Sequence, residues 1–185
     1  MSERVKVGGN RRIDHILDPA FLEGLADLAT EELRRRRDLT RAELEYLSYF
    51  RRLLQVRQDI LSAERDRRES GDGASVVDRL PEILSEGGPG GGAASPRGQY
   101  LPVEVPDEEI QLARRGAEAL VADAQLSDLE AFTDEGLAET IDRLAAAEGE
   151  VSEDRGAVFE VHDALQDELK ERYRADLSQV TTEPR

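Results

Sequence analysis

Apolar residues recur at alternating steps of three and four along two long stretches of the chain. In and just before the first stretch, about residues 41–68, the row consists of Leu39, Ala42, Tyr46, Tyr49, Leu53, Val56 and Ile60. In the second, about residues 133–177, it consists of Leu137, Ile141, Leu144, Val151, Val158, Leu165 and Leu169. This repeat is typical of helices that pair along a narrow apolar row, as in a coiled coil. No run alternates with period two, so the sequence predicts an all-α protein built on a long antiparallel helical hairpin.

Four further apolar residues of the first stretch lie about 90° around the helix from its predicted row. They are Leu47, Phe50, Leu54 and Leu61. We expect this second face to be left exposed by the hairpin, and to be covered by an N-terminal helix, by a partner protein or by both.

Capping signals predict where the helices begin. Asp18 is an acidic cap ahead of a proline, which predicts a shorter helix over residues 18–36. Thr40 and Glu43 have the spacing of a capping box, so the first long helix is expected to begin directly after Thr40. The last long helix is expected to begin at Asp134 or one residue earlier.

The composition changes abruptly between the two hairpin helices. Residues 87–98 read GGPGGGAASPRG, which predicts a flexible, disordered linker. The resulting segments are a flexible N-terminus (1–17), an N-terminal helix plus the first coiled-coil helix (18–68), a Gly/Pro-rich linker (69–106), a helix plus the long second coiled-coil helix (107–178), and a flexible tail (179–185).

Composition and charge narrow the functional classes. Charged residues are nearly as frequent as hydrophobic ones, 36% against 38%, which suits long helices that share narrow apolar rows. The net charge of −16 argues against binding duplex DNA or RNA and favours a basic protein partner. The absence of cysteine, of a signal peptide and of a long apolar run predicts a cytoplasmic protein that does not span a membrane. Only two of the 25 basic residues are lysines, a bias that either a GC-rich genome or recognition of guanine and phosphate by arginine explains.

Each long helix carries a column of polar residues with the same internal spacing. The first column is Ser48, Arg51, Gln55 and Asp59, and the second is Glu148, Ser152, Arg155, Phe159 and Asp163. At about 100° per residue, each column falls on one narrow strip of helix surface. We expect the first column to face away from the hairpin row and the second to run beside its row. Ala145, Gly149 and Gly156 flank the second column, which suggests that something flat approaches the backbone there.

These residue types fit a guanine nucleotide. Arginine donates two hydrogen bonds to the O6 and N7 of guanine, carboxylates accept from its N1–H and N2–H, and serine donates to phosphate. Duplication of the set suits a ligand that is itself two-fold symmetric. The alternative interpretation is ordinary helix surface with tolerated glycines.

The doubled column resembles the signature of the actinobacterial anti-sigma factor family RsiG, E-x3-S-x2-R-x3-Q-x3-D, which that family carries on each helix of an antiparallel coiled coil. The resemblance implies binding of a cyclic di-GMP dimer and, in the loaded state, sequestration of the sporulation sigma factor WhiG. It also implies that the ligand-binding residues are Ser48, Arg51, Gln55, Asp59, Glu148, Ser152, Arg155 and Asp163.

The chain departs from that signature at two positions. Leu44 stands where the first copy has glutamate, although Glu45 is its neighbour. Phe159 stands where the second copy has glutamine, and it offers stacking or packing in place of a hydrogen bond.

Nothing in the sequence indicates an enzyme. His15 and His162 are the only histidines, and neither belongs to a nucleophile or metal motif. The glycine-rich tract lacks the lysine of a phosphate-binding loop. Two hypotheses follow: a cyclic di-GMP-loaded anti-sigma factor, and a coiled-coil adaptor or scaffold with no small-molecule ligand.

Overall fold

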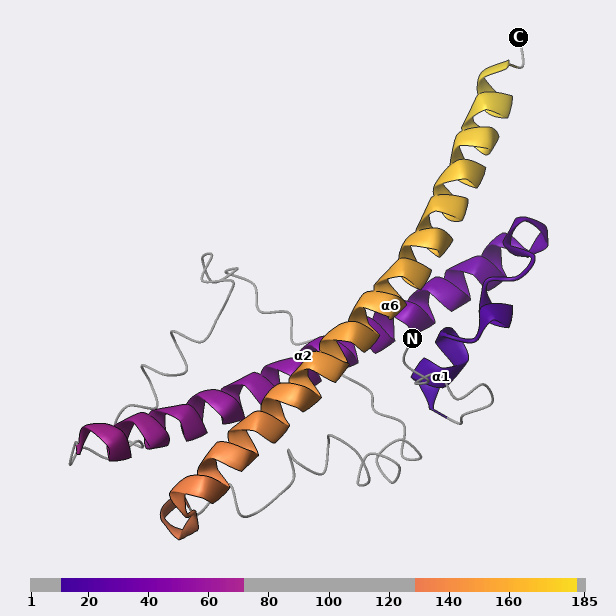
Figure 1. The fold of residues 1–185 in the computed structure, drawn as a ribbon. Coiled ribbons are helices and arrows are strands. Elements are labelled where there is room, and N and C mark those ends of the chain that lie inside the picture. The colour runs from indigo at the N-terminus through magenta and orange to yellow at the C-terminus, as the bar shows by residue number, and fades with distance from the viewer. Residues whose placement is uncertain (1–10, 72–128, 183–185) are drawn as a thin grey trace. The chain divides into compact units, whose positions relative to one another are not determined.

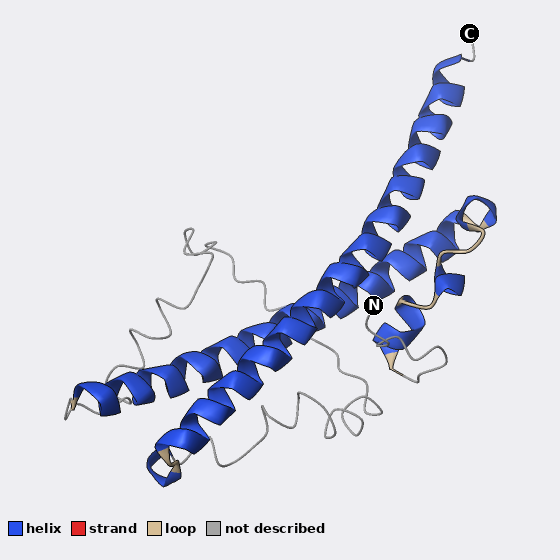
Figure 2. Ribbon diagram, viewed as in Figure 1, coloured by secondary structure: helices blue, strands red, loops and turns tan. Residues whose placement is uncertain are grey.

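The computed structural model describes residues 11–71 and 129–182, and everything in this range that is regular is helical (Figures 1 and 2). The elements are the short helix α1 (Arg12–Ile16), the 3₁₀ turns η1 (Pro19–Phe21) and η2 (Leu25–Asp27), the long helix α2 (Thr30–Ser70), the turn η4 (Leu129–Ala131) and the long helix α6 (Asp134–Thr182). No strand occurs among these residues. The all-α prediction is therefore confirmed.

The N-terminal residues fold differently from the prediction. Residues 18–36 were expected to form one helix, but η1 and η2 occupy its first half and Gly24 lies between them at φ +64°. That left-handed conformation ends the first turn of helix. Asp18 does act as a cap, since its Oδ1 accepts a hydrogen bond from the backbone N of Ala20 at 2.9 Å. Helix α1 lies within the predicted flexible N-terminus, and its Ile13 and Ile16 are buried.

Helix α2 begins eleven residues earlier than predicted and runs through Thr40 without a break. The Thr40 side chain is fully buried and caps nothing; its hydroxyl donates to the carbonyl of Arg37 within the same helix, at 2.7 Å. Threonine tolerates this position because the helix itself accepts its proton. The predicted helix boundary at Thr40 was therefore wrong.

Helix α6 begins where it was predicted to begin. Thr133 caps it, because its hydroxyl accepts a hydrogen bond from the backbone N of Gly136 at 3.1 Å. All seven residues of the predicted α6 row are buried, together with Ala147 and Val161. The row of the second hairpin helix is confirmed.

The row that α2 buries lies one residue away from the predicted one. The buried apolar residues are Leu33, Leu47, Phe50, Leu54 and Leu61. Six of the seven predicted residues are only half-buried, and Tyr49 is 55% exposed. The face expected to await an N-terminal helix or a partner is thus the face that the fold itself buries.

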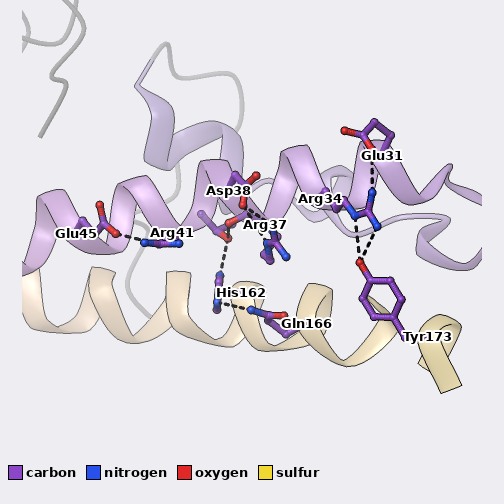
Figure 3. Close-up of polar contacts among 10 residues, drawn as sticks. Glu31, Arg34, Arg37, Asp38, Arg41, Glu45, His162, Gln166 and Tyr173 are labelled. Atoms are coloured by element: carbon purple, nitrogen blue, oxygen red, sulfur yellow. Dashed lines mark hydrogen bonds and ion pairs between the residues drawn. The ribbon is translucent and has the colours of Figure 1, made fainter. Parts of the chain in front are cut away.

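The chain divides into two compact units, and each long helix runs through both. The first unit comprises residues 1–47 and 153–185. In it, Arg34 donates to the hydroxyl of Tyr173 at 2.9 and 3.1 Å, and Thr40 meets His162, so that α2 and α6 run antiparallel (Figure 3). Arg172 of α6 also donates to the carbonyls of Leu25 and Ala26, at 2.8 and 3.0 Å.

The second unit comprises residues 48–152, described over 48–71 and 129–152. Arg68, at the end of α2, donates to the carbonyls of Leu129 and Phe132 at 2.7 and 2.8 Å and pairs with Asp134 at 2.9 Å. Since Asp134 is the first residue of α6, the end of one helix is fastened to the start of the other. The antiparallel hairpin is confirmed in this unit as well.

The linker, the helix expected from residue 107 and the end of the tail lie outside the described residues. Helix α6 continues to Thr182, five residues beyond its predicted last residue, Leu177.

Candidate functional site

Four residues of the two polar columns meet in the second unit around one carboxylate oxygen. Glu148 Oε1 accepts hydrogen bonds from Gln55 Nε2 at 3.0 Å, from Ser152 Oγ at 3.2 Å and from Arg51 Nη1 at 3.4 Å. Arg51 and Gln55 come from α2, whereas Glu148 and Ser152 come from α6. The two columns, 97 residues apart in sequence at Arg51 and Glu148, are thus joined across the hairpin. We refer to these four residues as the Glu148 cluster.

The position of the first column explains how it reaches α6. Arg51 follows the buried Leu47 by four residues and precedes the buried Leu54 by three, so it adjoins the buried row on the helix surface. The prediction that this column faces away from the hairpin row was wrong, because it was measured from the wrong row. Both columns flank the buried rows.

The Glu148 cluster is partly shielded from water. The side chains of Arg51 and Glu148 are 35% and 22% exposed. Arg51 therefore has one guanidinium nitrogen close to the carboxylate while part of its side chain still faces solvent. A guanidinium held in this way is oriented before a ligand arrives.

Asp59, the last residue of the first column, is half-buried. Burial raises the pKa of its carboxyl group above the ordinary aspartate value, and the nearby Arg52 opposes this rise only partly. A carboxylate that has lost part of its hydration gains from any donor that approaches it. Ser48, at the start of the column, is also half-buried.

Two residues of the second column, Arg155 and Asp163, belong to the first unit. Arg155 is half-buried and Asp163 is exposed, and both lie in the middle of α6. Phe159 lies one helical turn from each of them and is 47% exposed.

Leu44 stands where the first copy of the motif has glutamate, and the structure describes both Leu44 and its neighbour Glu45. Leu44 is half-buried, and its side chain offers no acceptor. Glu45 pairs with Arg41 at 3.0 Å, one turn back on the same helix (Figure 3). Glu45 is thus engaged within α2 in this structure.

His162 has a structural partner that sequence reasoning did not find. Its Nδ1 lies 3.0 Å from the hydroxyl of Thr40, whose proton is already donated to Arg37 (Figure 3). The other ring nitrogen, Nε2, lies 3.4 Å from the side-chain amide nitrogen of Gln166. This arrangement joins α2 to α6 within the first unit. The signal in the sequence was a histidine inside an otherwise apolar repeat.

The described residues contain no cluster of three or more histidine, cysteine, aspartate or glutamate side chains suited to a metal ion. None of the helices over residues 11–71 and 129–182 is long and apolar enough to cross a membrane.

The described residues thus form an all-α hairpin in which four polar residues of the two columns meet beside the buried rows. Comparison with known families defines it further: residues 19–84 match the family model described as RsiG-like. The match covers just over a third of the chain, and over these residues the chain is similar to that family. The matched range includes the whole first column. No curated protein matches the chain.

Proposed function

We propose that this RsiG-like protein binds a dimer of cyclic di-GMP through its two polar columns and, in the loaded state, sequesters a WhiG-like sigma factor in the cytoplasm, which represses late sporulation genes. The observation that carries the proposal is the Glu148 cluster, in which residues of both columns share one acceptor. This contact between residues of the two columns supports a role for both in one site.

The cluster supports ligand binding because it orients donors in advance. Glu148 restrains Arg51 and Gln55, so a ligand does not have to pay the full entropy of ordering these side chains. The Arg51 guanidinium has five N–H donors, and a single contact with Glu148 leaves others for a guanine edge or a phosphate. Asp59 adds a partly desolvated acceptor suited to the guanine N1–H and N2–H groups.

The charge of the chain supports the proposed protein partner. A net charge of −16 complements the basic surfaces with which sigma factors contact DNA. A protein that covers such a surface competes with DNA for it.

A ligand-free adaptor is the second candidate, and the same cluster favours it. Glu148 already satisfies three donors, and a partly buried polar network of this kind also fixes the register of paired helices. Ligand titration separates the two functions.

The test is isothermal titration of cyclic di-GMP into the wild type and into the double variant Arg51→Ala/Arg155→Ala. We expect binding by the wild type and none by the double variant, with the helical circular dichroism signal unchanged. A matched control replaces Arg65 and Arg143, exposed arginines of the same two helices that lie outside the columns. Equal affinity in the wild type and the double variant would contradict the proposed site, and no binding by the wild type would favour the adaptor.

A further inference from the structure

Phe159 is a large apolar side chain that stands in solvent in the middle of a helix. Of the four large hydrophobic side chains exposed among the described residues, Tyr49 and Tyr173 carry a hydroxyl group and Leu177 lies near the end of α6. Phe159 has no polar group and lies far from both ends of α6, yet it is 47% exposed. A single exposed apolar residue is common and decides nothing by itself. Its neighbours on the helix decide what it does.

Charged side chains lie one helical turn from Phe159 in each direction. Arg155 precedes it by four residues and Asp163 follows it by four, so the three form one strip of α6 within the first unit. About half of the phenylalanine surface between this arginine and this aspartate is left to solvent. The same three residue types together provide stacking, a cation and an acceptor.

The surface beside Phe159 is open down to the backbone. Gly156 lies three residues before it, and a Cβ built on Gly156 would meet nothing within 4 Å among the described residues. Alanine would fit that position and would stabilise the helix better than glycine does. Within that distance, no described atom blocks a flat ring from lying against α6 at Gly156, next to the phenyl group.

We propose that Phe159 is a stacking platform for one guanine base of cyclic di-GMP, an inference that rests on the function proposed above. The base lies flat beside the phenyl ring and over Gly156. Asp163 accepts from the N1–H and N2–H of the same base, and Arg155 contributes the positive charge. Aromatic side chains bind nucleobases in this way with little dependence on base identity, so guanine selectivity at this half of the site falls to Asp163 and Arg155.

The two polar columns differ in chemistry at the motif position that Phe159 occupies. The corresponding position of the first column is Gln55, which donates a hydrogen bond to Glu148 at 3.0 Å. One column therefore contributes hydrogen bonding at this position and the other contributes stacking.

The experiment titrates cyclic di-GMP into full-length wild type and into Phe159→Ala, Phe159→Leu and Phe159→Trp. We expect about tenfold weaker binding by the alanine and leucine variants, since leucine keeps the apolar bulk but loses the flat ring. The tryptophan variant should bind at least as tightly as wild type. Because the chain has no native tryptophan, its emission reports on this position alone and should be quenched by the stacked guanine. Tyr49→Ala, which removes an aromatic ring that is 55% exposed outside the columns, is the control and should bind normally.

Each result separates this inference from the proposed function. If the wild type fails to bind cyclic di-GMP, the proposed function is overturned and the platform with it. If the wild type binds, but Phe159→Leu binds equally well or the tryptophan emission does not change at saturation, the platform alone is overturned. Circular dichroism of each variant confirms that its helices are intact.

Discussion

Three polar side chains lie in the row that α2 buries, and each has a partner. Thr40, Glu43 and Glu64 are 0%, 3% and 3% exposed. Thr40 bonds to His162, Glu43 pairs with Arg12 of α1, and Glu64 is held by Arg67 and Arg68. A buried polar group without a partner costs about 1–3 kcal/mol, so these contacts are what allow the row to be buried.

Glu64 should make the stability of the protein depend on acid pH. Hydrogen bonds from Arg67 are the main reason that its pKa is lowered to about 2, and Arg68 adds to the effect. Since the folded pKa lies below the unfolded value, its contribution is complete above about pH 5 and is lost as the pH falls toward 2. We expect Glu64→Gln to lower the free energy of unfolding by about 2 kcal/mol at pH 7. Urea denaturation of both proteins at pH 7 and pH 3 measures this difference, which should shrink at the lower pH; a difference that stays constant contradicts the assignment.

Replacing Asp59 should affect ligand binding but not stability, whereas replacing Glu64 should lower stability. Partial burial raises its pKa, which means that the folded protein disfavours the ionised form at neutral pH. Asp59→Asn should therefore leave the melting temperature unchanged or slightly higher, while it weakens cyclic di-GMP binding about tenfold or more. In the wild type, ligand affinity should fall as the pH is lowered through the raised pKa, because the acceptor becomes protonated. Thermal melting and titration at pH 7 and pH 5 check both statements, and a variant that is less stable but binds normally contradicts them.

Among the elements, α6 was predictable and the N-terminal half of α2 was not. The α6 row is apolar at every predicted position, so the periodicity identified it directly. Helix α2 has two rows of residues, one residue apart, that could each pack against α6. The periodicity favours the more apolar of the two. The fold buries the other row, because its three polar residues have partners. Thr40 contacts His162 of α6, Glu43 pairs with Arg12 of α1, and Glu64 pairs with Arg67 of α2 itself. A periodicity argument does not reveal these partners.

The glycines of α6 permit a test at the level of the helix. Gly149 and Gly156 have open space where a Cβ would be. The double variant Gly149→Ala/Gly156→Ala should raise helix stability by about 0.5–1 kcal/mol per site, since alanine loses less backbone entropy on folding. If a ligand approaches this face closely, the two methyl groups should weaken its binding.

Glu139→Ala is the matched control for the glycine variant, because it places alanine on an exposed part of α6 away from the second column. Thermal melting and cyclic di-GMP titration are measured on all three proteins. A double variant that is more stable and binds as well as the wild type shows that the glycines do not serve the ligand.

At the scale of the whole molecule, the sequence predicted the residues of the two polar columns but not that four of them form the Glu148 cluster. Repetition of one spacing identified all eight residues. The meeting of four of them around Glu148 depends on which row α2 buries, and an error of one residue in that row turned the first column away from α6. Glu45 illustrates the same limit, since its engagement with Arg41 becomes visible only in the structure.

Binding of the sigma factor and of the nucleotide should be thermodynamically coupled. If the complex binds cyclic di-GMP more tightly than the free protein does, the nucleotide must tighten the complex by the same factor. We expect sigma-factor affinity to rise at least tenfold in saturating cyclic di-GMP, and this gain to be lost in Asp59→Asn and Asp163→Asn. Surface plasmon resonance with and without the nucleotide measures the effect. Equal affinity under both conditions would leave a nucleotide-independent anti-sigma factor.

Arg68 has a consequence for how this chain can vary in length. It joins the last turns of α2 to the carbonyls of Leu129 and Phe132 and to Asp134, so the end of α2 is fastened directly to the start of α6. Each doubling of residues 72–128 would then cost only about 0.6 kcal/mol of closure entropy. The closed end of the hairpin is accordingly a permissive site for inserted domains, and a chain cut anywhere between residues 72 and 128 still has the contacts with which its two pieces can reassemble.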